Sequence, residues 1–185
     1  LVLPPSLAPI QVVIVPIYRS DEERAMVEAA AEQIKTKLED LDFSVKFDNR
    51  DTYKPGYKFA EWELKGVPVR IAIGPRDVAN GTVELARRDT KEKSVTAIEG
   101  IELHIKALLK TIQTDIYERA RSFRDSNIHE VNSWDEFKTV LDSKGGFISA
   151  HWDGSGETED KIKELTKATI RCIPLGNKEE AGICV

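Results

Sequence analysis

Aromatic rings and cations alternate along residues 51–93, and this combination can bind single-stranded nucleic acid. The rings are Tyr53, Tyr57, Phe59 and Trp62, and the cations are Lys54, Lys58, Lys65, Arg70, Arg76, Arg87, Arg88, Lys91 and Lys93. Each base that stacks on an exposed ring contributes about 1–3 kcal/mol, while cations hold the phosphates. The segment therefore predicts a site for a single strand whose bases are splayed outward.

Carboxylates also lie among these cations, which a surface that binds only phosphate does not need. They are Glu61, Glu63 and Asp77. A carboxylate accepts hydrogen bonds from the N1–H and N2–H edge of guanine, and Arg or Lys donates to its O6 and N7. The two-signed set is therefore typical of a guanine site. The competing interpretation is an ordinary charged surface beside a core that contains Trp62 and Tyr57.

Signatures of common catalytic sites are absent from the sequence, which has no Gly-x-Ser-x-Gly, P-loop, dinucleotide glycine fingerprint or His-Glu-x-x-His. The histidines His104, His129 and His151 are scattered, and Cys172 and Cys184 are too far apart for a Cys-x-x-Cys zinc knuckle. One alternative function is a small α/β enzyme with a carboxylate site made by Asp51, Glu61 and Glu63. No histidine lies near these three in the sequence.

Composition indicates an ordinary globular protein of 185 residues, with 41% hydrophobic and 32% charged residues. The net charge is −5, so a DNA-coating protein is not expected. No apolar run approaches about 18 residues, so no membrane span is predicted. Two cysteines fit a reducing cytoplasm. The first residues lack the basic region of a signal peptide, and they resemble a linker cut from a longer chain.

Hydrophobic patterning predicts an α/β domain: a mixed sheet of about five strands with flanking helices. Strands are expected at residues 11–18, 43–47, 69–73, 82–87 and 93–97. Ser20 caps a helix whose inner stripe begins at Met26, a short helix covers 58–65, and a long one runs from Ile101 through Phe123. Asn80-Gly81 favours a hairpin turn.

A second, smaller α+β domain follows. Ser133 caps a helix, residues 158–168 form another, and strands are expected at 147–152, 169–173 and 183–185. The expected division is therefore a linker at 1–8, a first domain at 9–127 and a C-terminal domain at 128–185.

Three blocks of sequence resemble a known family. The run from Pro55 to Pro68, then Arg70, then Gly74-Pro-Arg-Asp77 closely resembles the anticodon-binding domain of prolyl-tRNA synthetases of the archaeal and eukaryotic type. The resemblance extends upstream to residues 7–17 and downstream to 146–154 and 166–175, so it covers essentially the whole chain. It implies the anticodon-binding fold of class II synthetases, in a C-terminal fragment.

The resemblance also implies roles for particular residues. Phe59 would stack near the anticodon, Glu63 and Asp77 would read base edges, and Arg70 and Arg76 would be their cationic partners. Arg88 and Lys93, or Lys91 in place of Lys93, would contact the anticodon loop. Proline codons begin with CC, so the anticodon ends in two guanines, and this agrees with the carboxylate and cation set noted above.

The same resemblance sets expectations about cofactors and partners. ATP and Mg²⁺ would bind a catalytic domain upstream, so this fragment would hold no cofactor and would not aminoacylate tRNA(Pro) alone. The parent enzyme is expected to be a cytoplasmic homodimer, with no membrane or DNA partner. The alternative is a stand-alone module, related to anticodon domains, that binds a nucleic acid or a protein.

The C-terminal domain departs from relatives that hold a structural zinc through Cys-Gly-x-x-x-Cys and a later Cys-x-x-Cys. Asp153 and Thr158 stand at the first pair of ligand positions, and only Cys184 remains of the second pair. One thiolate cannot build a tetrahedral zinc site, so no zinc is expected.

Overall fold

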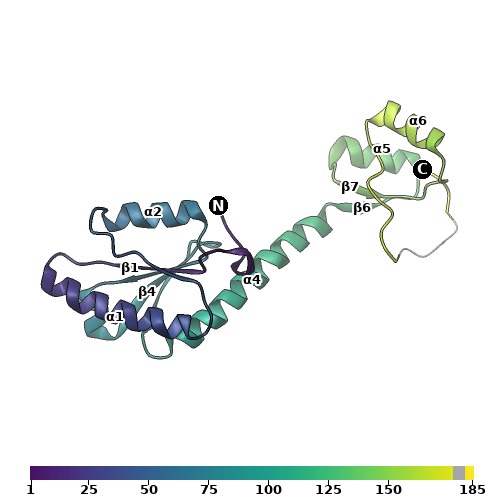
Figure 1. Cartoon of the computed structure of the whole chain (residues 1–185). Coiled ribbons are helices and arrows are strands. Elements are labelled where there is room, and N and C mark those ends of the chain that lie inside the picture. The colour runs from purple at the N-terminus through teal and green to yellow at the C-terminus, as the bar shows by residue number, and fades with distance from the viewer. Residues whose placement is uncertain (177–181) are drawn as a thin grey trace. The chain divides into compact units, whose positions relative to one another are not determined.

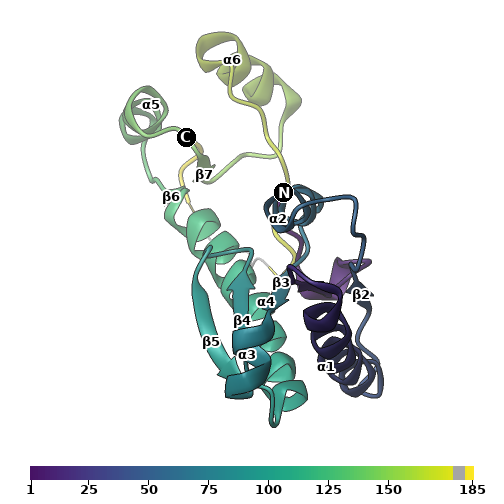
Figure 2. The same ribbon diagram turned by 90° about the vertical axis from the view of Figure 1, so that its left-hand side faces the viewer.

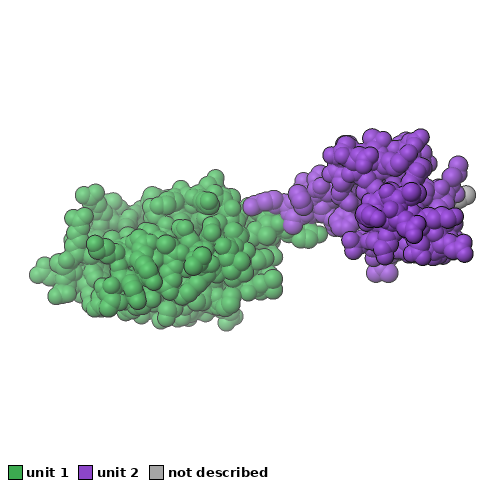
Figure 3. Space-filling model, turned by 90° about the horizontal axis from the view of Figure 1, so that it is seen from above, with its two compact units in different colours: residues 1–118 green, residues 119–185 purple. Residues whose placement is uncertain are grey.

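The computed structural model describes residues 1–176 and 182–185 of a chain that divides into two compact units. Unit 1 is Leu1–Glu118 and unit 2 is Arg119–Val185 (Figure 3). The division falls inside the long helix α4 (Ile101–Ser126), whereas the sequence places the domain boundary after residue 127. No helix among the described residues has the length and apolar character needed to cross a membrane.

Unit 1 is built on a mixed sheet of five strands in the order β2-β1-β3-β4-β5. The strands are β1 (Val12–Pro16), β2 (Val45–Phe47), β3 (Val69–Ile73), β4 (Thr82–Arg87) and β5 (Lys93–Ala97). β1 pairs in parallel with β2 and β3, whereas β3, β4 and β5 pair antiparallel. This sheet confirms the predicted α/β class and its mixed, five-stranded architecture.

Helices cover the two faces of the sheet unequally (Figures 1 and 2). α1 (Asp21–Glu39) and α4 pack on one face, over a core that includes Ile14, Ile71 and Leu85. α2 (Pro55–Lys65) packs on the opposite face, where Trp62 joins Val13 and Val15 in a smaller cluster. Because α2 lies over β1, the β4–β5 part of that face stays open.

α1 begins where the sequence predicts, but its buried stripe differs from the predicted one in the N-terminal half of the helix. The Ser20 Oγ accepts a hydrogen bond from the Glu23 backbone N–H at 3.2 Å, as a capping residue should. Ile34 and Leu38 of the predicted stripe are buried, but Met26 is 43% exposed, and Val27 and Ala31 complete the buried stripe. Residues spaced by four throughout, counted from Met26, gradually rotate away from one face, because the helix has 3.6 residues per turn. Residues spaced alternately by three and four stay on one face.

The connection between β3 and β4 is a short helix rather than the predicted hairpin turn. α3 (Pro75–Asn80) starts at a proline, and Gly81 ends it in the left-handed region at φ +64°. Glycine reaches this conformation without steric strain, so Asn80-Gly81 acts as a helix stop. The two strands still pair antiparallel.

The residues expected to be a linker, 1–8, contact unit 1. They contain a 3₁₀ turn η1 (Pro5–Leu7) in which Pro5 is buried. The Leu3 backbone N–H donates to the Gly66 carbonyl oxygen at 3.3 Å, so this segment passes the C-terminal end of α2.

Unit 2 contains β6 (Ile128–Glu130), α5 (Trp134–Ser143), β7 (Phe147–Ser149) and α6 (Gly156–Thr166). β6 and β7 pair in parallel, and Ser133 caps α5 as predicted. The strands expected at 169–173 and 183–185 are wrong, because neither segment has regular secondary structure. An alternating apolar pattern forms a strand only where a partner edge is available. Within the part of the chain that the structure describes, residues 183–185 make one backbone hydrogen bond, from the Val185 N–H to the His151 carbonyl oxygen.

α4 also departs from the sequence expectation near its end. Its first half buries Ile101, Ile105 and Ile112 as predicted, but Phe123 is 73% exposed. The last turns of α4 lie outside unit 1, so the core that covers the first half is not there to cover Phe123.

Candidate nucleic-acid interface

A pocket of about 210 Å³ opens in unit 1 between α2 and the strands that follow it. Its apolar lining is Val13, Trp62, Val67 and Ala86. Its charged lining is Glu63, Arg70, Arg87, Arg88, Lys91 and Lys93. One carboxylate therefore faces five cations beside an indole ring, which matches the two-signed, aromatic composition expected from the sequence.

Arg70 connects the two walls of this pocket. It stands on β3, in register with Val13 of β1 and Ala86 of β4, and it is only 5% exposed. Its guanidinium lies over the ring of Phe59 from α2, with Cζ 3.6 Å from the ring centroid. This cation–π contact fixes the plane of the guanidinium.

The hydrogen bonding of Arg70 is incomplete. Nη1 and Nη2 both approach one oxygen of Glu84, at 3.4 and 3.5 Å, and both distances are long for such bonds. The Nε atom is buried and finds no hydrogen-bond partner in the described part of the chain. Burial lowers the pKa of Arg70, while the negative charges of Glu84 and Glu63 oppose that shift. A buried cation with an unused donor is suited to a ligand that supplies an acceptor atom.

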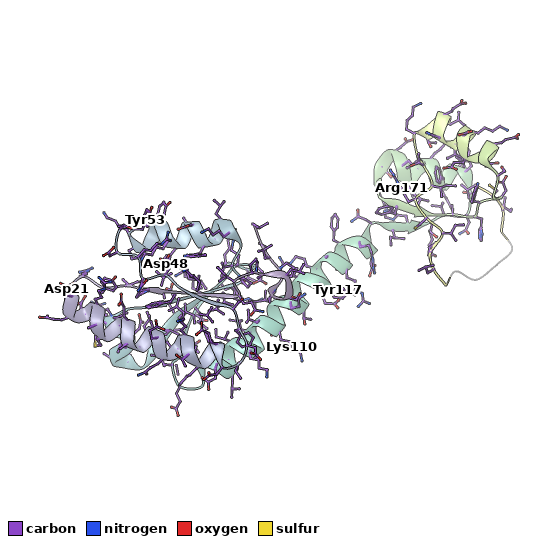
Figure 4. All side chains as sticks on the ribbon, viewed as in Figure 1. Asp21, Asp48, Tyr53, Lys110, Tyr117 and Arg171 are labelled. Carbon is purple, nitrogen blue, oxygen red and sulfur yellow. The ribbon has the colours of Figure 1, made fainter. Side chains whose placement is uncertain are left out.

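A buried carboxylate, that of Asp48, holds in place the side of the pocket that α2 forms. Asp48, labelled in Figure 4, follows β2 and is 1% exposed. Its Oδ2 accepts a hydrogen bond from the Trp62 indole N–H at 2.8 Å. Arg50 donates to both Asp48 oxygens, at 2.7 and 2.8 Å, and the Lys58 Nζ donates to the Asp48 carbonyl oxygen. The bonds from Arg50 and Trp62 outweigh desolvation and lower the pKa of Asp48 to about 2. Trp62 is thereby fixed as a wall of the pocket.

The remaining cations come from the end of β4, the turn after it and the start of β5. The Arg88 Nε donates to the Glu63 carbonyl oxygen at 2.9 Å, which joins this turn to α2. Lys91 lies in the turn at φ +64°, and the Lys93 Nζ lies 3.6 Å from Glu84. Arg87 is compensated, because its guanidinium binds Asp89 and Asp115.

Arg76 and Asp77 do not line this pocket. The Asp77 Oδ2 accepts from the Gly74 backbone N–H at 2.8 Å and so caps the start of α3. Arg76 is exposed beside it. Four strand residues of about 3.3 Å each separate Arg70 from Gly74, so the two places lie roughly 13 Å apart along β3.

The structure thus brings together Phe59, Glu63, Arg70, Arg88 and Lys93 of the seven expected site residues. Lys91, the alternative to Lys93, lines the same pocket. Glu84 was missed by sequence reasoning. Alternation along 82–87 places Glu84 on the side opposite Val83 and Leu85, but only the strand register reveals that Arg70 and Lys93 are its neighbours.

Two of the three carboxylates of the alternative enzyme site are engaged elsewhere, and the third, Glu63, lines the pocket described above. Glu61 binds Arg50 at 2.5 Å and Lys65 at 2.7 Å, and Asp51 lies 3.9 Å from Arg24. Among the residues that the structure describes, no three or more His, Cys, Asp or Glu side chains are grouped as a metal site requires.

The positions that correspond to zinc ligands in some relatives hold a hydrogen-bonded network. The Thr158 Oγ1 donates to the Asp153 Oδ2 at 2.7 Å, and the Ser155 backbone N–H donates to the Asp153 Oδ1 at 2.8 Å. Cys184 is a half-buried thiol. Structural zinc sites use thiolates and imidazoles, so this donor set does not fit a zinc ion.

The side chains that line the pocket can bind a flat, polar ring that has hydrogen-bond donors on one edge and hydrogen-bond acceptors on another. Glu63 can accept from the donor edge, and Arg70, Arg88 or the lysines can donate to the acceptor edge. Trp62 and Phe59 supply aromatic surface. Among nucleobases, guanine has this pattern of donors and acceptors.

Comparison with known proteins shows the family of both parts of the chain. Residues 11–115 match the family model described as "Anticodon binding domain", and residues 134–185 match "Prolyl-tRNA synthetase, C-terminal". The chain is 62% identical over 185 residues to the Proline--tRNA ligase of Flavobacterium johnsoniae and 57% identical to that of Christiangramia forsetii.

A third relative, the Proline--tRNA ligase of Bacteroides fragilis, is 56% identical over 190 aligned residues. These alignments cover the whole of this chain but only 38% of each relative. The first match takes in the entire sheet, the pocket and α3, which together make up most of unit 1. The chain therefore belongs to the anticodon-binding domain family, in the form found in proline–tRNA ligases.

Proposed function

We propose that this chain binds the anticodon loop of tRNA(Pro) and that its pocket takes one of the two guanines at the end of the anticodon. The observation that carries the proposal is the pocket itself: Glu63 on one side, the four cations Arg70, Arg88, Lys91 and Lys93 on the other, and aromatic rings from α2. Arg70 adds a buried donor that has no partner of its own.

Arg76 and Asp77 are proposed as a second contact point for the loop. They repeat the pairing of a cation with a carboxylate, at the opposite end of β3 from Arg70. The gap of roughly 13 Å between the two places exceeds the stacking distance of neighbouring bases, so the two guanines would have to be splayed apart.

The activity of the full-length protein is part of the proposal. Its relatives are named for the ligation of proline to tRNA, and this chain spans 38% of their length. We infer that ATP and Mg²⁺ act in the portion outside this chain, in a cytoplasmic homodimer. The chain alone would then bind tRNA without aminoacylating it.

The test is binding of an anticodon stem-loop by the 185-residue chain. A stem-loop that carries the two guanines is compared with one in which both are adenines, by fluorescence anisotropy at a fixed salt concentration. A bidentate base contact discriminates by about 1–3 kcal/mol, so the guanine loop should bind at least about tenfold more tightly. Equal affinity for the two loops would refute the proposal.

A further inference from the structure

Glu84 contacts two cations of the pocket, Arg70 and Lys93, without lining the pocket itself. It stands on β4, paired with Ala72 of β3 and Val95 of β5. One of its oxygens lies 3.4 Å from the Arg70 Nη1 and 3.6 Å from the Lys93 Nζ.

Strand register explains why these three side chains meet. Arg70, Ala86 and Lys93 form one row across β3, β4 and β5, because Ala86 pairs with both of the others. Glu84 lies two residues from Ala86, and residues two apart in a strand point to the same face of a sheet. The Glu84 side chain therefore lies on the same face of the sheet as Arg70 and Lys93, and its carboxylate reaches between these two cations.

Its charge matters because the pocket is strongly positive. Arg70, Arg88, Lys91 and Lys93 line it against the single negative charge of Glu63, whereas Arg87 already has its own carboxylates. A surface with that excess of positive charge attracts phosphate from any strand, regardless of sequence.

We propose that Glu84 determines specificity for guanine by acting as a counter-ion to Arg70 and Lys93. It keeps the Arg70 guanidinium flat against Phe59, with donors directed at the base, and it reduces the attraction of the pocket for phosphate. Glu84 is thus a positioning residue that acts through the two cations. This inference rests on the proposed function, since it assigns the base preference of the same site.

The contact distances fit this role. Hydrogen bonds of 3.4 and 3.5 Å to Arg70 are too long to satisfy the guanidinium, so Glu84 orients Arg70 but leaves it able to bond to a ligand. The Glu84 side chain is 37% exposed, so surrounding atoms do not enclose its carboxylate. A tight bidentate pair would hold the donors of Arg70 and prevent their use.

The test compares Glu84→Gln with Glu92→Gln as a matched control. Both variants remove one negative charge from the β4–β5 hairpin, but Glu92 lies in the exposed turn, where it accepts a hydrogen bond from the Thr90 Oγ1, whereas Glu84 lies between Arg70 and Lys93. Affinities for the guanine and adenine stem-loops are measured over a series of salt concentrations. Circular dichroism melts check that each variant folds.

Glu84→Gln should reduce discrimination between the two loops about tenfold, which corresponds to about 1.4 kcal/mol. The affinity for the adenine loop should rise. The plot of the logarithm of the binding constant against the logarithm of the salt concentration should become steeper by about 0.7, which is the slope for one more phosphate contact on a single strand. Glu92→Gln should leave discrimination unchanged. The proposal is overturned if Glu84→Gln weakens both loops equally with no change of slope.

A second variant, Glu84→Asp, keeps the charge but shortens the side chain. It should retain the shallow salt dependence of the wild type while losing part of the discrimination, because the carboxylate no longer reaches Arg70 fully. A steep salt dependence in Glu84→Asp would contradict the counter-ion role even if Glu84→Gln failed to fold. If wild-type protein binds both loops equally, the proposed function fails, and the salt dependence of the adenine loop still tests Glu84.

Discussion

The guanidinium carbon of Arg70 lies 3.6 Å from the centre of the Phe59 ring, and this contact joins β3 to α2 across the pocket. The two residues come from elements of different type, eleven positions apart in the sequence, so the sheet and the helix must be packed correctly before the stack forms. The contact is therefore both a support of the pocket and a part of it. It leads to the first of five predictions.

Replacing Arg70 with lysine should weaken binding of the guanine stem-loop about tenfold or more. Lysine keeps the positive charge but loses the planar fork that stacks on Phe59 and donates in parallel. In the full-length enzyme, Arg70→Ala should raise the KM for tRNA and leave proline-dependent ATP–pyrophosphate exchange intact. Equal loss of both activities would indicate misfolding rather than a lost RNA contact.

Replacing Asp77 with asparagine separates its structural role from RNA binding. The asparagine carbonyl can still accept the bond from the Gly74 N–H, so the melting temperature should change little. Affinity for the guanine loop should fall about tenfold, because asparagine brings an N–H₂ toward a base edge that itself donates. Unchanged affinity would show that Asp77 serves only as a helix cap.

Replacing Asp48 with asparagine should destabilise unit 1 by about 2 kcal/mol, the order of a buried hydrogen bond to a charged group. The variant loses the charge that Arg50 and Trp62 both contact inside the protein. Chemical denaturation measures the difference. Asp51→Asn is the control: its side chain is 68% exposed, its ion pair with Arg24 is 3.9 Å long, and less than about 0.5 kcal/mol is expected.

The same carboxylate predicts a pH dependence. The pKa of Asp48 falls from an ordinary 3.8 to about 2 on folding, so its contribution to stability is complete above the ordinary value and is lost as pH falls toward 2. The difference in unfolding free energy between wild type and Asp48→Asn should therefore shrink between pH about 5 and about 2. A difference that stays constant over this range would contradict the assignment.

Replacing Gly146 with alanine should disrupt the parallel pair β6–β7 in unit 2. An alanine Cβ there would lie 2.5 Å from the Asn127 carbonyl oxygen, at a φ of +91°. The adjacent Gly145, at φ +65°, has open space around it. Gly145→Ala should cost about 1–2 kcal/mol from backbone strain alone, and Gly146→Ala about 3 kcal/mol or more. Limited proteolysis of the C-terminal region gives the comparison, and equal sensitivity of the two variants would refute it.

Much of the fold could be predicted because local patterns and tertiary packing agree in unit 1. A continuous apolar run predicted β1, an alternating pattern predicted β3, and Ser20 and Ser133 marked the starts of α1 and α5. Failures came where a local signal had two structural solutions. Asn80-Gly81 ends a helix as readily as it turns a hairpin, and residues 169–173 alternate without finding a partner strand.

The candidate site was predicted in composition but not in geometry. Residue types indicated a two-signed set of charges, the resemblance singled out Glu63, Arg70, Arg88 and Lys93 from it, and the structure places all four around one pocket. The separation of Asp77 from that pocket depends on its position at the far end of β3, which composition does not encode. Glu84 stayed hidden because its contacts depend on the pairing of three strands.

The continuity of α4 determines where the protein can be divided if its two units are to be expressed separately. The helix runs without a break from Ile101 to Ser126, past the point after Glu118 where the units divide. A gene truncated at that point would cut off roughly two helical turns and leave a frayed end on either piece. Recombinant versions of the first half should therefore extend to Ser126, and versions of the second should start upstream of Arg119.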